Sequence, residues 1–128
     1  MTTDDILDAL ADLQHDLGKY LAMPVTMLPA DATDSALREA VRGALLVTRT
    51  GANGPRTARS IWEDFLREVG DRCADAPGWD VLGAAVERAL AWEPRLDGNA
   101  PLDRGAVTED LRAVGAAIRD VMTNSEVP

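Results

Sequence analysis

Apolar side chains recur every three or four positions along most of the chain, which is the spacing of one face of an α-helix. The first such stretch covers residues 4–23, with Thr3 as a candidate N-cap and Pro24 expected to end it. Runs that alternate between apolar and polar residues, as strands require, are nearly absent. The pattern therefore predicts an all-α fold, a single-domain bundle of four to five helices over residues 1–128. The later helices are predicted at about residues 35–50, 55–74, 79–92 and 104–123.

Prolines and glycines separate the predicted helices. Residues 24–33 hold two prolines and three large apolar side chains, so we expect an extended, partly packed connection. Turn residues at 51–54 precede Pro55, which is expected in the first turn of the next helix. The polar tail, about residues 123–128, is expected to fray.

Aromatic residues are few, and the three tryptophans are placed differently. Trp62 belongs to the strongest apolar stripe, which Cys73 continues, and is predicted to be core. Trp79 and Trp92 lie at the two ends of one predicted helix. They are expected to cap the core, with the role of interface anchors as the alternative.

The composition argues against several classes of function but does not identify one. The chain has 128 residues, is 46% hydrophobic and carries a net charge of −9. This charge argues against general binding to nucleic acid and against an anionic membrane surface. One cysteine and one histidine exclude a disulfide and any metal site that needs two of either residue, and no cofactor is predicted. The acidic N-terminus and the lack of a long apolar run favour a cytoplasmic protein.

The single histidine, His15, is predicted to face solvent. On a helical wheel it lies opposite the apolar side chains of its helix and on the same side as several charged residues, including Lys19. Gly18 is unusual inside a helix, where it costs about 1 kcal/mol relative to alanine. Its lack of a side chain is interpreted as leaving room beside the imidazole.

The residues around His15 resemble those of histidine phosphotransfer domains and of histidine-kinase dimerisation helices. Asp16 follows the histidine, Lys19 lies one turn beyond it, and Gly18 is the small neighbour. The resemblance implies an imidazole nucleophile at His15 with Lys19 near the phosphoryl oxygens. No ATP-binding part is present, so the phosphoryl group would come from a partner protein.

The same segment, His15 to Lys19, is also similar to the His-Asp motif of HD-domain phosphohydrolases, which are all-α. That family binds metal through additional histidines, and this chain has none. The resemblance therefore implies a degenerate relative. An ordinary surface histidine is the third interpretation.

Arginines gather in the middle of the chain. Helical spacing places three of them on one side of the second predicted helix, and two more open the third. We predict a docking surface for an acidic partner, with a solvated face that pairs with the protein's own acids as the alternative. The five residues are Arg38, Arg42, Arg49, Arg56 and Arg59.

Together these patterns predict a small signalling or regulatory adaptor that is not an enzyme and acts by binding another protein. A more specific version of this prediction is that the adaptor also accepts a phosphoryl group at His15. The alternatives are a degenerate HD-type phosphohydrolase relative and a structural subunit of a larger complex.

Overall fold

The computed structural model describes residues 3–47, 49–51 and 54–126. These residues form helices almost throughout, together with one short hairpin. The elements in chain order are α1 (Thr3–Leu13), the π-helical turn η1 (Gln14–Gly18), α2 (Met23–Thr26), α3 (Asp34–Leu46), β1 (Arg49–Gly51), β2 (Gly54–Arg56), α4 (Ala58–Cys73), α5 (Trp79–Leu90), the 3₁₀ turn η2 (Pro94–Asp97) and α6 (Arg104–Glu126).

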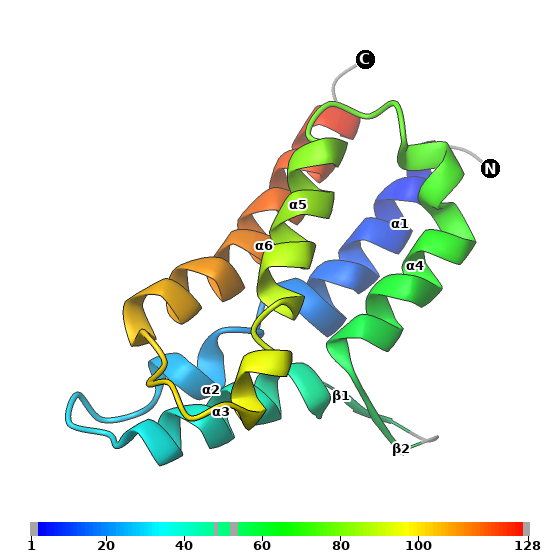
Figure 1. Ribbon diagram of the computed structural model, residues 1–128. Helices are drawn as coiled ribbons and strands as arrows, with labels where there is room; N and C mark the ends of the chain where they lie inside the picture. Colours follow the sequence, from blue (N-terminus) through cyan, green and yellow to red (C-terminus); the bar gives the residue numbers. More distant parts are fainter. Residues whose placement is uncertain (1–2, 48, 52–53, 127–128) are drawn as a thin grey trace.

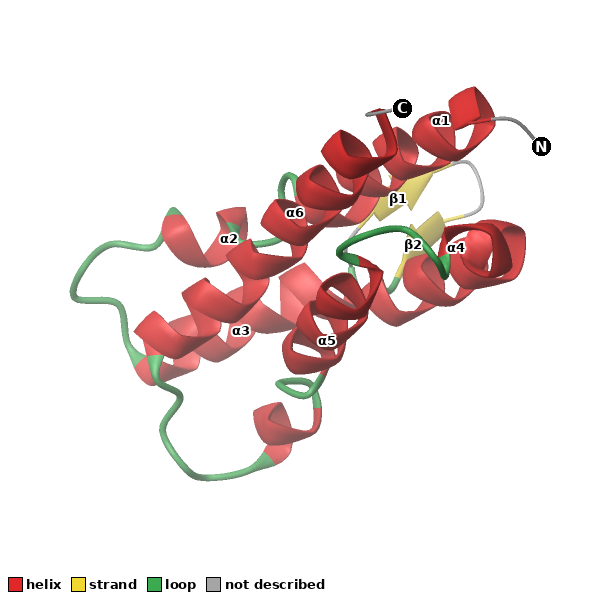
Figure 2. Cartoon of the chain, turned by 90° about the horizontal axis from the view of Figure 1, so that it is seen from above, coloured by secondary structure: helices red, strands yellow, loops and turns green. Residues whose placement is uncertain are grey.

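Four helices, α1, α4, α5 and α6, form a closed bundle in which each contacts the next: α1 with α4, α4 with α5, α5 with α6, and α6 with α1 (Figure 1). The remaining helices, α2 and α3, lie at one end of the bundle, on the side of the loops that precede α3 and α6 (Figure 2). Buried apolar residues from all of these helices form one core cluster. The prediction of an all-α bundle is confirmed.

Two helix starts follow from local side-chain chemistry. The hydroxyl of Thr33 accepts a hydrogen bond from the N–H of Ala36 at 3.1 Å, and the hydroxyl of Thr57 accepts one from Ser60 at 3.0 Å. Each satisfies a backbone donor that the first turn leaves unpaired. Pro55 lies in β2, so its predicted place in the first turn of a helix was wrong.

The hairpin is the main departure from the predicted pattern. The helix expected to reach residue 50 ends at Leu46, and β1 pairs with β2 in antiparallel register, with Arg49 opposite Arg56 and Gly51 opposite Gly54. Strands of three residues are too short to show an alternating pattern. The Asn-Gly pair at 53–54 was the available hairpin signal, although residues 52–53 themselves lie outside the described residues.

The first helix also ends earlier than expected. Regular α-helix stops at Leu13, η1 follows, and Pro24 lies in the first turn of α2 rather than stopping a helix. The connection expected to be extended thus begins with a helical turn, in which Val25 is fully buried. Proline suits this place because the first helical N–H has no intrahelical partner.

The bundle core contains an aromatic group from two helices. The Trp62 and Phe65 rings stack at 5.7 Å between centroids, and Trp79 lies 5.9 and 6.1 Å from them. Trp62 is buried, as predicted. Trp92 is also buried, and its indole N–H donates to Asp110 at 2.7 Å.

Helix α6 extends beyond residue 123, where the last predicted helix ends. It continues through residues 123–126, and the Asn124 side-chain amide donates a hydrogen bond to the carbonyl of Pro77 at 3.0 Å. The expected fraying of the tail stays a prediction, and residues 127–128 lie outside the described residues. Within the described residues, no helix combines the length and the apolar character needed to cross a membrane.

Candidate functional site

His15 lies in η1, where the chain departs from regular α-helix. The N–H of Lys19 donates to the carbonyl of Gln14 at 2.7 Å, an i→i+5 bond that widens the turn. The imidazole is exposed, as the helical wheel predicted. π-Helical turns are rare and frequently occur at functional sites. The turn is therefore a stronger indication of a functional site at His15 than the exposure of the imidazole.

A shallow groove of about 100 Å³ runs between η1, the start of α2 and the end of α3. We call it the His15 groove. Two of its apolar side chains are notably exposed, Tyr20 at 44% and Val47 at 52%. The residues that line it are His15, Asp16, Tyr20, Leu21, Pro24, Gly43, Ala44 and Val47.

Tyr20 connects the two residues that the phosphotransfer resemblance singles out. Its ring meets the His15 ring edge-on at 6.2 Å, and the ammonium of Lys19 lies 5.3 Å from its centroid. His15 and Lys19 therefore flank the same aromatic ring. Tyr20 was absent from the predicted site because the sequence showed only that it follows Lys19.

Gly18 does not lie beside the imidazole. It is buried against α6, where an added Cβ would stand 3.0 Å from the Cα of Gly115 and 2.8 Å from Cδ1 of Ile118. The interpretation that Gly18 leaves room beside the imidazole was wrong. Glycine is needed there because two helix backbones approach closely.

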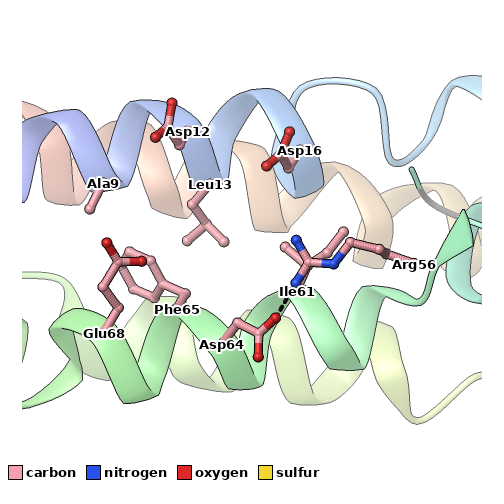
Figure 3. A pocket seen from close by; sticks show the side chains of 9 residues that line it. All are labelled: Ala9, Asp12, Leu13, Asp16, Arg56, Ile61, Asp64, Phe65 and Glu68. Atoms are coloured by element: carbon pink, nitrogen blue, oxygen red, sulfur yellow. Dashed lines mark hydrogen bonds and ion pairs between the residues drawn. The ribbon is translucent and has the colours of Figure 1, made fainter. Parts of the chain in front are cut away.

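Asp16 is half-buried and lines both the His15 groove and a second groove between α1 and α4. Figure 3 shows this second groove, with Asp12 on α1, Asp16 on η1, and Asp64 and Glu68 on α4. Arg56 projects into it from β2 and forms an ion pair with Asp64. Acidic side chains therefore dominate the rim between these two helices.

Arg38 has a structural role. Its guanidinium donates to the carbonyls of Arg95 and Leu96, each at 3.0 Å, to that of Ala100, and to the carboxylate of Asp34 at 2.8 Å. Its side chain is only 14% exposed. These bonds hold the loop after α5 against α3 and leave little of the group for a partner.

The same network acts on Asp34. The backbone N–H of Leu102 donates to its carboxylate at 2.9 Å, and this bond, with Arg38, holds the pKa of Asp34 below its ordinary value. Desolvation opposes the shift but does not outweigh it.

Of the other predicted arginines, Arg42 lies one turn after Arg38 on α3. It pairs with Glu39 on the same helix and lies 3.9 Å from Asp97. Arg49 is in β1, so its predicted place on the second helix was wrong. Arg56 is in β2, and Arg59 is exposed in the first turn of α4. The five residues thus lie on four elements.

Comparison with protein-family models, with curated proteins and with solved structures found no match for this chain. Among the described residues, no three His, Cys, Asp or Glu side chains lie where they could hold a metal ion. The functional argument therefore depends on the geometry around η1.

Proposed function

We propose that this protein is a small regulatory adaptor that binds a partner protein through the His15 groove, with the cytoplasm as its compartment. The supporting observation is the exposure of Tyr20 and Val47 around the chain's only histidine. Contiguous apolar side chains at the surface of a soluble domain mark interaction sites. Tyrosine and histidine add polar atoms that give such a surface specificity.

The sharper form of this proposal is phosphoryl transfer to His15. A ring nitrogen of the neutral imidazole attacks the phosphorus of an aspartyl phosphate on the partner. A P–N bond forms, the P–O bond to the partner's carboxyl breaks, and the carboxylate leaves with the electron pair. The second ring N–H then releases its proton to solvent. Lys19, across Tyr20 from His15, is a positioning residue for the phosphoryl oxygens.

Site-directed photo-crosslinking tests the docking surface. A photoreactive amino acid replaces Val47 in the groove or, as a matched control, Val81 on α5, which is 59% exposed. In the cells that make this protein, we expect one discrete crosslinked partner from position 47 and none from position 81. Equal crosslinking from both positions, or none from position 47, contradicts the proposal.

Phosphoryl transfer has its own test. The protein is isolated from its own cells at alkaline pH, and mass spectrometry measures the phosphoryl group on its tryptic peptides. We expect acid-labile phosphate on the peptide that contains His15, and its loss in His15→Gln. Acid-stable phosphate, or phosphate that persists in the variant, excludes transfer to His15 and leaves docking to be judged by crosslinking.

A further inference from the structure

A cavity of about 350 Å³ lies on the other side of η1, between this turn and α6. It shares Lys19 with the surroundings of Tyr20, but its remaining lining comes from Gln14, Gly18, Ala22 and one face of α6. The volume is within the range of small-molecule sites. This cavity is separate from the His15 groove, and the inference drawn from it does not depend on the proposed function.

Three cations line the cavity, Lys19, Arg112 and Arg119, and no carboxylate does. In a chain of net charge −9 this is a marked local excess of positive charge. Within the described residues, none of the three forms an ion pair. By contrast, Arg56 and Arg67 both pair with Asp64.

The floor of the cavity is formed by backbone and by one amide. Gly18 and Gly115 bring η1 and α6 together, and the side-chain N–H of Gln14 donates to the carbonyl of Gly115 at 3.2 Å. Oε1 of Gln14 is buried and accepts no hydrogen bond. This oxygen lies inside the contact between η1 and α6 and is closed to a ligand in the cavity.

We propose that this cavity binds a small organic phosphate. Arg112 and Arg119 lie two turns apart on one face of α6, and Lys19, the residue after η1, lines the same cavity, so three cations are available to one dianion. Guanidinium groups bind phosphate oxygens with two parallel hydrogen bonds. The cavity is larger than a phosphate group alone, and the remaining volume accommodates the organic part of the ligand.

The test is a titration of the full chain with glucose 6-phosphate at constant ionic strength, followed by ¹H–¹⁵N NMR. We expect saturable shifts at the amides of Gly18 and Gly115, with a Kd of about 1 mM or tighter. Inorganic phosphate is expected to shift the same amides, because the three cations bind the phosphate group itself, and to bind more weakly because it leaves much of the cavity unfilled. Shifts that rise linearly without saturating, or that lie elsewhere, overturn the proposal.

Variants separate a site from general attraction of anions. Arg112→Gln combined with Arg119→Gln removes two exposed charges and is expected to weaken glucose 6-phosphate binding at least tenfold. Arg67→Gln, on α4 and 74% exposed, removes a charge elsewhere and is expected to bind as the wild type does. Equal weakening by Arg67→Gln contradicts the proposal.

Discussion

Gly115 and Gly18 allow two helix backbones to approach closely, and only the folded chain reveals this contact. A Cβ on Gly115 would stand 2.8 Å from the carbonyl oxygen of Gly18 and 3.2 Å from its carbonyl carbon. Both are backbone atoms of η1, so they cannot move aside as a flexible side chain would. Sequence alone marked Gly18 as unusual but could not show what approached it.

Gly115→Ala is therefore expected to lower the free energy of unfolding by about 1–3 kcal/mol. Gly43→Ala is the matched control, because nothing beyond its own stretch of helix backbone lies within 4 Å of its added Cβ. Since Gly43 is inside α3, alanine there is expected to raise the free energy of unfolding by about 0.5–1 kcal/mol. Urea unfolding measures both, and a Gly115→Ala protein as stable as Gly43→Ala disproves the close contact.

Cys73 is 1% exposed at the end of α4, and burial raises the pKa of its thiol. Because the thiolate is the reactive species, a thiol reagent is expected to label the native protein at least ~100-fold more slowly than the urea-unfolded protein at the same pH. The rate of absorbance change on labelling measures this. Rates within a few-fold of each other would show that α4 does not protect the thiol.

At the scale of elements, the apolar periodicity predicted which segments are helical. It did not predict where some of these helices end. The stripe through Ile61, Trp62, Phe65 and Val69 predicted α4, and all four side chains are buried. The end of α3 depended on the hairpin beyond it, whose pairing is fixed by contacts between strands rather than by helical spacing. Likewise, η1 needs an i→i+5 bond that no residue pattern specified.

The attachment of the loop after η2 to α3 gives a pH-dependent prediction. Asp34 has a lowered pKa in the folded protein, first because of the Leu102 N–H bond and then because of Arg38. A lowered pKa contributes stability above the ordinary value of 3.8, and that contribution is lost as pH falls through the folded value. The protein is thus expected to lose stability below this range.

Asp34→Asn removes this contribution. Its free energy of unfolding, from urea titrations between pH 6 and pH 2, is expected to fall less steeply below pH 3.8 than that of the wild type. Asp71→Asn, at an exposed position of α4, controls for the loss of one charge. If Asp34→Asn follows the wild-type curve throughout, the Leu102 and Arg38 contacts do not act on the carboxylate.

At the scale of the whole molecule, the packing of the bundle determines which charged residues lie close together. The arginines that sequence grouped as a docking surface are divided among α3, the hairpin and α4, and Arg38 is engaged with backbone carbonyls. Conversely, Lys19 and Arg112 are 93 positions apart in the sequence, yet they line one cavity. Helical spacing relates neighbours on one helix, whereas sites between helices require the packing of the bundle.

The helical wheel predicted that His15 is exposed, but it did not predict the groove that His15 lines. Tyr20 and Pro24 follow the π-helical turn, and Val47, the residue after α3, is 32 positions from His15. Their convergence is the observation that supports the proposed docking surface on the His15 side of the bundle. The apolar exposure there has no other assigned role in the fold.

Isothermal titration calorimetry with the partner captured from position 47 tests the proposed docking surface most directly. Val47→Asp places a charge in the groove and is expected to weaken binding at least tenfold, about 1.4 kcal/mol. Val81→Asp, at an equally exposed position on α5, is expected to bind with the wild-type Kd. Wild-type affinity in Val47→Asp, or equal losses in the two variants, would contradict docking at the His15 groove.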